Sequence, residues 1–562
     1  MASRLILHST QLFGASDPFV LKAIDGALWY LAQQKNCDEV DVIFHPTRNP
    51  FNIFGIMLDG ARKVKHVPEK LRHLLCNSWA RIQSAPKLDR EYISDSDDQC
   101  LAVAEGNPDS VIVRLRYKPY PVITSFRDFI LIHVKAIELF GRSFEKGRFN
   151  GALLLKTRYG PILIGDLVGS SALRLRPYGG GSLSHCKLAV LEQLVDAITF
   201  SRYINRNLLG QFEVKINSAI LVREPTYLDA IYNRMLSHYG VGVIELYAYN
   251  SIYRLVNAEK YRPFSERVIS RCTIKLNDDW IVNAMNYLSE RIADPSRRLA
   301  YMQTGTNHEP NLLDEDQKPI KLVKGVASAA VFLHSFDDAQ YVFGLDGFAD
   351  LFDWTRFTIK TLLSNPKIGK VLIKSHPNVD YRNYTGDKKA MDRLKKMFPV
   401  SDKLCWVNAC SGPKSFRNAG DFIGITHHGS IAEELVFLGV PVIASICAPW
   451  RDQYHFLNIW TSVEHYKALL MSDPRDLIVT EKDKLELFAY VCEARLSVNI
   501  TQQDRWPWYK ILDAFCIDSS GQFFDVLGRA NEMLKKNHLQ QDVLIKYFEA
   551  QLKKYRELAM TQ

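Results

Sequence analysis

Hydrophobic and polar positions alternate along this chain in a way that predicts short buried strands separated by helices. Short apolar runs bounded by polar or glycine-containing turns are typical of strands in an open sheet, and apolar positions three and four residues apart are typical of helices. The pattern predicts strands at residues 5–8, 39–44, 111–116, 122–124, 218–222, 240–246, 329–333, 370–374, 404–407, 422–426 and 441–444. It predicts helices at residues 17–33, 56–90, 128–137, 188–209, 348–363, 388–397 and 431–438, and one that ends near residue 239. This alternation indicates an α/β fold with open sheets.

Two segments interrupt the alternation. Residues 151–156 and 161–167 are apolar on both sides of a Tyr159-Gly160 turn, which predicts a β-hairpin. Residues 307–324 are polar and contain prolines, which predicts a linker. Because 562 residues exceed one ordinary core, we predict an N-terminal α/β domain with insertions at residues 1–320, a second α/β domain at 325–500 and a helical extension at 501–562.

The sharpest chemical signal lies in the strand–turn–helix unit at residues 421–458. The predicted strand ends in a polar turn, and the helix that follows stops at Gly439. The turn consists of His427, His428, Gly429 and Ser430, and Glu433 and Glu434 follow within one helical turn. The first N–H groups of a helix lack partners within it and carry partial positive charge, so this turn suits an anion, with carboxylates in reach of sugar hydroxyls beside a phosphate. Such a unit also occurs in sheets that bind nothing there, which leaves a purely structural role open.

A second signal follows the strand predicted at residues 370–374. This strand ends in Lys374, and His376 and Pro377 come directly after it. Ligands bind at the carboxyl ends of strands in open α/β folds, where a lysine attracts phosphate and a histidine donates one directed hydrogen bond. Together with the turn at 427–430, this segment predicts a phosphate-binding edge in the second domain.

Composition excludes several classes of function. The formal net charge of +9 is mild for this length, and no basic patch is interleaved with aromatic residues, which argues against nucleic acid as a partner. Ten cysteines without a Cys-x-x-Cys pair predict buried thiols in a reducing compartment. No Gly-x-Gly-x-x-Gly or P-loop pattern occurs, which argues against dinucleotide oxidoreductases and P-loop kinases. The Asp-x-Asp pairs at 95–97 and 314–316 lie in polar stretches, so solvated loops are favoured over metal sites.

The segment Lys374-Ser375-His376-Pro377 and the stretch THHGSIAEELVFLGVPVI at residues 426–443 resemble the donor domain of GT-B glycosyltransferases. Among these, the chain resembles the bacterial capsular and surface-polysaccharide biosynthesis proteins, with Kdo and polyol-phosphate transferases as wider relatives. The resemblance extends over residues 331–458 and is fragmentary over 153–246. It implies two Rossmann-like domains facing each other across a cleft, with C-terminal helices. It also implies sugar transfer from a nucleotide-sugar donor to a growing surface glycan or a lipid-linked glycan.

Carried over position by position, the resemblance implies a donor site in the second domain. Its residues are Lys374, His376, His427, Gly429, Ser430, Glu433, Glu434, Asp452 and Gln453. The resemblance implies that His376 and the turn at 428–430 hold the nucleotide phosphates. It further implies that Glu434 accepts hydrogen bonds from the ribose hydroxyls. Asp452 and Gln453 would hold the donor sugar. The nucleotide sugar is then the substrate, and neither a metal nor a further cofactor is implied.

Transfer also needs a base for the acceptor hydroxyl, which the N-terminal domain supplies in such enzymes. Asp166, at a predicted strand end, is the first candidate, ahead of His8 and Asp17, and a capping role is its structural alternative. His428 is the candidate for stabilising the leaving group, together with the helix N-terminus, in place of a metal. Whether His427 or His428 faces the ligand stays open from the sequence.

Three other functions fit parts of the same pattern. The stretch at 429–443 also resembles the donor-binding turn of UDP-N-acetylglucosamine 2-epimerases, and CDP-polyol phosphotransferases share the Lys-x-His-Pro pattern. A catalytically inactive scaffold for polysaccharide assembly is the alternative from another class. The N-terminal segment lacks the features of a secretion signal, and no apolar window reaches the ~18 residues that a spanning helix needs. We therefore expect a cytoplasmic protein that can associate peripherally with the inner face of the cell membrane.

Overall fold

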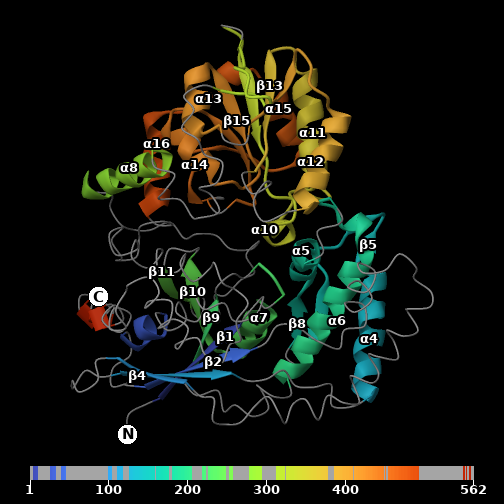
Figure 1. Cartoon of the computed structure of the whole chain (residues 1–562), viewed down its shortest axis with the longest axis vertical. Helices are drawn as coiled ribbons and strands as arrows, with labels where there is room; N and C mark the ends of the chain where they lie inside the picture. Colours follow the sequence, from blue (N-terminus) through green and yellow to red (C-terminus); the bar gives the residue numbers. More distant parts are fainter. Residues whose placement is uncertain are drawn as a thin grey trace.

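A computed structural model shows two sheets, each with its own helices, following one another along the longest axis of the molecule (Figure 1). The structure describes residues 4–10, 26–32, 39–45, 99–103, 111–117, 126–157, 160–175, 180–205, 218–222, 226–228, 230–247, 252–256, 278–293, 312–322, 325–376, 385–408, 411–448, 450, 453–492, 549–550, 552–553 and 556–557. The helix predicted at 56–90 and nearly all of the extension predicted at 501–562 lie outside these residues.

The second sheet is parallel throughout, with the strand order β14-β13-β12-β15-β16-β17. Its strands are β12 (Ser328–Phe332), β13 (Lys370–Lys374), β14 (Leu404–Val407), β15 (Phe422–Ile425), β16 (Val442–Ser445) and β17 (Asn458–Trp460). The chain runs outward from β12 to β14 on one side and then begins β15 on the other side of β12. A switch point therefore lies between β12 and β15, and in open α/β sheets ligands bind outside the carboxyl ends of strands at such points.

Helices cover both faces of this sheet, which explains its apolar strands. The helices are α8 (Asp278–Ala293), α10 (Gln340–Phe343), α11 (Leu351–Ser364), α12 (Thr385–Met397), α13 (Pro413–Ala419), α14 (Ile431–Phe437), α15 (Val463–Met471) and α16 (Glu481–Val491). Ala329 and Val331 of β12 pack in a cluster with α11, α12 and α15, whereas Ala330 and Phe332 pack in a cluster with α14 and α16. Strands buried on both faces read as continuous apolar runs.

Helix α8 packs against α14 and α16, although the predicted division at residues 320–325 assigns it to the first domain. That division stays a prediction. Gly439 ends α14 with a left-handed φ of 81°, as its place after the apolar helix predicts.

The first sheet is mixed, with the strand order β11-β10-β9-β1-β2-β4-β3. Its strands are β1 (Arg4–Thr10), β2 (Glu39–His45), β3 (Gln99–Val103), β4 (Val111–Tyr117), β9 (Ser218–Val222), β10 (Gly242–Tyr247) and β11 (Ile252–Val256). The five inner strands are parallel, and β3 and β11 pair antiparallel at the two edges. Together the two sheets confirm the predicted α/β class.

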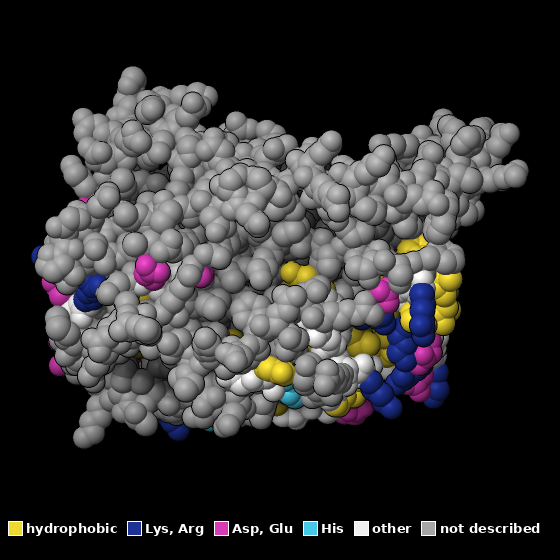
Figure 2. All heavy atoms as spheres, turned by 90° about the horizontal axis from the view of Figure 1, so that it is seen from below, with side chains coloured by type: hydrophobic (Ala, Val, Ile, Leu, Met, Phe, Trp, Pro, Cys, Tyr) yellow, Lys and Arg dark blue, Asp and Glu magenta, His cyan; other side chains and the backbone are white. Residues whose placement is uncertain are grey.

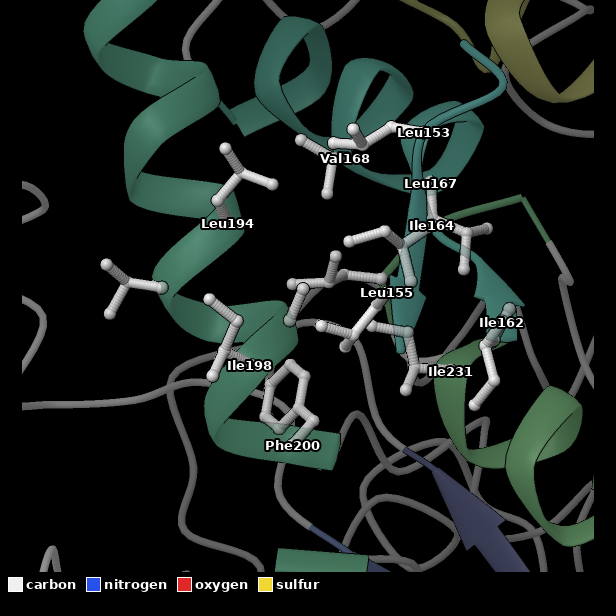
Figure 3. Packing of buried hydrophobic residues seen from close by; sticks show 14 of the residues in the cluster. Leu153, Leu155, Ile162, Ile164, Leu167, Val168, Leu194, Ile198, Phe200 and Ile231 are labelled. Carbon is white, nitrogen blue, oxygen red and sulfur yellow. The ribbon is translucent and has the colours of Figure 1, made fainter. Parts of the chain in front are cut away.

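A compact layer of helices and hairpins lies beside the first sheet. It contains α4 (Phe126–Gly141), β5 (Phe144–Glu145), β6 (Arg148–Phe149), β7 (Leu154–Thr157), β8 (Gly160–Leu163), α5 (Gly165–Leu175), η1 (Leu183–His185), α6 (Lys187–Tyr203) and α7 (Ala230–His238). Figure 3 shows Leu155, Ile162 and Ile164 in one buried cluster with Leu194 and Ile198 of α6.

The predicted hairpin forms as β7 and β8, but its second strand is shorter than predicted. It ends at Leu163, and α5 begins at Gly165, so Asp166 and Leu167 belong to a helix. Gly165 passes close to backbone: a Cβ there would lie 2.6 Å from the carbonyl oxygen of Asn150, which leaves room only for glycine.

The two units meet at α10, which packs against α5. Gln340 of α10 donates from Nε2 to the carbonyl oxygen of Gly181 at 3.1 Å. The Tyr227 hydroxyl donates to a carboxylate oxygen of Asp338. The loop that follows β12 is thus held by side-chain hydrogen bonds to the first unit.

Candidate functional site

Four histidines gather where the central strands of the parallel sheet end. His334 follows β12, His376 follows β13, and His427 and His428 follow β15. Because parallel strands end at one edge, residues almost a hundred positions apart become neighbours at the switch point.

The ring of His428 is held between two other rings. It stacks on His334 at 4.0 Å between centroids and on Phe343 of α10 at 4.3 Å. Its backbone N–H donates to Nε2 of His334 at 3.1 Å, and its Nδ1 lies 3.0 Å from Nδ1 of His427. His427 is fully buried between Trp354 and Trp460, whereas His428 is half-buried. Of the two, His428 is therefore the ring that can meet a ligand.

All four imidazoles are neutral at physiological pH. Burial lowers the pKa of His334 to about 3 and that of His427 to about 3, and it brings the pKa of His428 well below its ordinary value. Burial and then the charge of Lys374 lower the pKa of His376 to about 4. Neutral rings act as directed hydrogen-bond donors and acceptors, so the positive charge at this edge comes from the half-buried ammonium of Lys374.

The turn before α14 is shaped by packing on His334. A Cβ on Gly429 would lie 2.7 Å from Oγ1 of Thr426 and 3.2 Å from Cε1 of His334. Glycine is required here because a side chain would clash with the Thr426 hydroxyl and crowd the His334 ring. Helix α14 has 7 residues, and Ser430 is its N-cap residue.

An arginine that the sequence pattern does not single out occupies the start of α14. Arg291, near the end of α8, donates from Nε to Glu434 at 2.8 Å and from Nη1 to Glu433 at 3.2 Å. Its Nη2 donates to Oγ of Ser430 at 2.6 Å. Glu433 is fully buried and Glu434 is 5% exposed. Because Arg291 is more than 130 positions away in sequence, only the packing of α8 on α14 reveals it.

Gln453 lies half-buried in the turn after Trp450, and Asp452 lies outside the described residues. Trp450 and Tyr454 on either side pack edge-on against Tyr490 of α16. The described part of the proposed donor-sugar loop is therefore anchored by aromatic packing.

Asp166 lies inside the first unit, in the first turn of α5. Both of its carboxylate oxygens accept hydrogen bonds from Arg234 of α7 at 2.7 Å, and both side chains are almost fully buried. This is a paired structural carboxylate in the free protein, and its role as a base stays a prediction. The side chains of His8 and Asp17 lie outside the described residues.

No metal site is found in the described part of the chain: no three His, Cys, Asp or Glu side chains there are grouped to hold an ion. The Asp-x-Asp at 314–316 forms a tight turn, and Asp316 pairs with Lys318 on the surface. The pair at 95–97 is outside the described residues.

No family model matches the chain, and no curated protein matches it. Solved structures of trehalose-phosphate synthases are similar to it at a low level. The α,α-trehalose-phosphate synthase (UDP-forming) from Burkholderia vietnamiensis has 11% identity and a TM-score of 0.29, over 91% of this chain and 99% of that chain. The synthase from Burkholderia multivorans has 11% identity and a TM-score of 0.25, over 99% and 100% of the two chains. A trehalose-6-phosphate synthase studied with bisubstrate glycomimetics has 11% identity and a TM-score of 0.25, over 100% and 99%. Superpositions this weak support no inference, so the function is argued from the site alone.

Proposed function

We propose that this chain is a GT-B glycosyltransferase that moves a sugar from a nucleotide-sugar donor to a growing surface glycan, such as a capsule or lipopolysaccharide, or to a lipid-linked glycan. The proposal includes two Rossmann-like domains facing across a cleft and a nucleotide site in the second. The observation that carries it is the convergence of His334, His376, His428 and Lys374 at the switch point of a parallel sheet.

In this proposal Lys374 attracts the nucleotide phosphates, and His376, His428, Gly429 and Ser430 surround them. Neutral imidazoles suit this task because they donate directed hydrogen bonds without needing to be charged. His428 would stabilise the leaving diphosphate, since its ring is held at a fixed angle by the rings on both sides.

Glu434 would accept hydrogen bonds from the ribose hydroxyls, and we propose that Arg291 orients it. The guanidinium already holds Oε1 of Glu434, while Glu433 supplies a second, fully buried counter-charge. Asp452 and Gln453 would hold the donor sugar, and Asp166 remains the candidate base.

A second candidate is a scaffold that binds a nucleotide sugar without turning it over. The observation that favours it is that the carboxylate expected to act as a base, Asp166, is locked in a buried bidentate ion pair. Release of the nucleoside diphosphate in the presence of an acceptor glycan separates the two candidates.

Peripheral membrane association is part of the proposal. No helix in the described part of the chain is long and apolar enough to cross a bilayer. Helix α4 exposes Ile130, Leu131, Val134 and Ile137 on one face. Figure 2 shows hydrophobic side chains beside lysines and arginines on the side where Figure 1 places α4. Such a face suits a lipid surface that carries the acceptor.

The test is nucleotide binding by calorimetry and thermal shift, with UDP, GDP, CDP, CMP and their sugar conjugates. A ligand at about 100 times its dissociation constant should add about 2.7 kcal/mol of stability. His376→Ala should weaken binding of the preferred nucleotide by about 1–3 kcal/mol, since it removes one hydrogen bond to a charged group. His465→Ala, on the exposed surface of α15, is the control. No nucleotide binding, or equal affinity in His376→Ala and wild type, would remove the proposed donor site.

A further inference from the structure

A hollow lies at the junction of the two units, and no residue of the histidine cluster lines it. Its volume is about 410 Å³, within the range of pockets that bind small molecules. The β5–β6 hairpin and η1 line it from the first unit, and α10, α11 and α12 line it from the second. Tyr341 of α10 lines the hollow, while Phe343 of the same helix stacks on His428. One short helix therefore separates the hollow from the proposed nucleotide site.

The carboxylates in the hollow already have partners. Asp353 pairs with Arg356 at 2.6 Å. Asp350 is the N-cap residue of α11, and its Oδ1 accepts from the backbone N–H of Asp353 at 2.7 Å. Burial raises the pKa of Asp350 above its ordinary value, while hydrogen bonds and the nearby charge of Arg393 oppose that shift.

Two further guanidinium groups line the hollow from opposite sides. Arg148 lies on the β5–β6 hairpin and Arg393 on α12, and neither forms an ion pair with a described residue. The guanidinium of Arg393 lies over the ring of Phe352, 4.3 Å from its centroid. The charge of Arg393 acts on the Asp350 carboxyl group. The lining nevertheless holds three arginines against two aspartates, and this excess of positive charge predicts an anionic ligand.

The remaining lining suits a sugar. The hydroxyls of Ser182 and Ser184 lie 2.9 Å apart beside His185, and they offer hydrogen-bond donors and acceptors. Phe149 and Tyr341 pack edge to face at 5.0 Å and supply an aromatic wall. Small pockets that combine aromatic walls with a few polar groups orient polar ligands of this size.

We propose that this hollow binds a monosaccharide-sized anion, a sugar unit that carries a phosphate or a carboxylate. The arginines would hold the charged group, and the serines and aromatic rings would hold the sugar. Because the lining comes from both units, the bound ligand joins them. The inference does not depend on the nucleotide site, since no residue assigned there lines the hollow.

The experiment measures binding of glucose 1-phosphate, glucuronate and glucose to the full chain by calorimetry. We expect one or both anionic sugars to bind, and glucose to bind at least tenfold more weakly. The double variant Arg148→Ala/Arg393→Ala should lose at least tenfold in affinity for the anionic sugar. Arg475→Ala, at an exposed arginine that does not line the hollow, is the matched control and should bind like the wild type.

His376→Ala separates this site from the nucleotide site and should retain the anionic sugar. The proposal is overturned if neither anion binds, if glucose binds equally well, or if the double variant retains affinity while folded by circular dichroism. Loss of binding in His376→Ala with retention in the double variant would overturn it too, because the sugar would then occupy the sheet edge. Phosphate and carboxylate forms are distinguished by which of the two ligands binds.

Discussion

At the residue scale, the neighbours of each buried carboxylate decide its charge. Arg234 donates a hydrogen bond to each of the two carboxylate oxygens of Asp166. Glu434 is held by an arginine as well. Asp337, by contrast, is 1% exposed, lies beside Asp387, and has no hydrogen-bond partner for either oxygen among the described residues. Burial of this kind favours the protonated form of a carboxyl group.

Asp337→Asn should stabilise the protein at alkaline pH. Burial, and then the charge of Asp387, raise the pKa of Asp337 to about 8, while Arg174 opposes the shift. The Asp387 carboxylate accepts from Ser335 and from two backbone N–H groups, so the shared proton lies on Asp337. The folded state thus binds a proton that the unfolded state releases near its ordinary pKa of 3.8, and stability falls as the pH rises toward 8.

We expect the free energy of unfolding of Asp337→Asn, relative to the wild type, to be about 1–3 kcal/mol higher near pH 8 than near pH 5, because only the wild type must bind a proton on folding and this costs more as the pH rises. Urea denaturation at both pH values measures this. The buried histidines also make stability depend on pH, but they do so equally in both proteins. Their contribution therefore cancels in the difference between variant and wild type. Asp402→Asn, on an exposed turn, is the control; a pH-independent difference in Asp337→Asn would contradict the assignment.

Arg291→Met should destabilise the second unit strongly. It removes the guanidinium that Glu433 and Glu434 both contact, and loss of one partner from a buried ion pair costs about 3–5 kcal/mol. Arg475→Met, which breaks the exposed pair with Asp473, should change the free energy of unfolding little, because solvent screens such a pair. Urea unfolding followed by tryptophan fluorescence compares the two variants, and similar losses in both would show that Arg291 is not a structural partner.

At the element scale, two neighbouring helices of similar length differ in how much of their surface is buried. Helix α6 is buried nearly all round, including the polar side chains of Glu192, Gln193 and Asp196. Helix α4 packs on α6 with Ile132, Ala136 and Leu139 and turns its other apolar face outward. A second apolar face on an outer helix marks an interaction surface.

The outward face of α4 should bind vesicles that contain anionic lipid. Val134 is 57% exposed and Ile137 is 54% exposed. Lys135 lies on the same helix and forms an exposed ion pair with Glu138. Val134→Glu/Ile137→Glu should reduce co-sedimentation with phosphatidylserine vesicles at least fivefold, because it replaces apolar contacts by charges of the lipid's sign. Ile478→Glu, 70% exposed on the second unit, is the control. Equal sedimentation of both variants would exclude this face.

At the scale of the whole molecule, the loop after β12 connects the edge of the parallel sheet to the first unit and to α10. It begins with His334 at the nucleotide edge, continues through Asp337 and Asp338 at the contact with the first unit, and leads into α10. Gln340 ties this loop to both units, since its Nε2 contacts Gly181 and its Oε1 accepts from the start of α11. A ligand at the sheet edge and a ligand in the hollow would therefore contact the same short segment.

Local patterns along the chain predict several elements correctly. The strands predicted at 370–374 and 404–407 coincide residue for residue with β13 and β14, because strands buried on both faces are unbroken apolar runs. Gly439 correctly predicts the end of α14, because glycine adopts the left-handed conformation found there without steric cost. The strand β17 was not predicted, since its 3 residues are too short for a periodic signal. The strand predicted to reach residue 167 was too long, because apolar periodicity does not separate a short strand from the start of a buried helix.

Which residues meet depends on packing between elements that are distant in the sequence. The order of strands brings His334 onto His428, a contact across 94 positions. The packing of α8 brings Arg291 to Glu433 and Glu434, and the packing of α7 pairs Arg234 with Asp166. The local sequence identifies a charged residue, but it does not identify the distant side chain that forms an ion pair with it. The residue types along the chain therefore indicate the chemistry of this site, and the packing of strands and helices sets its geometry.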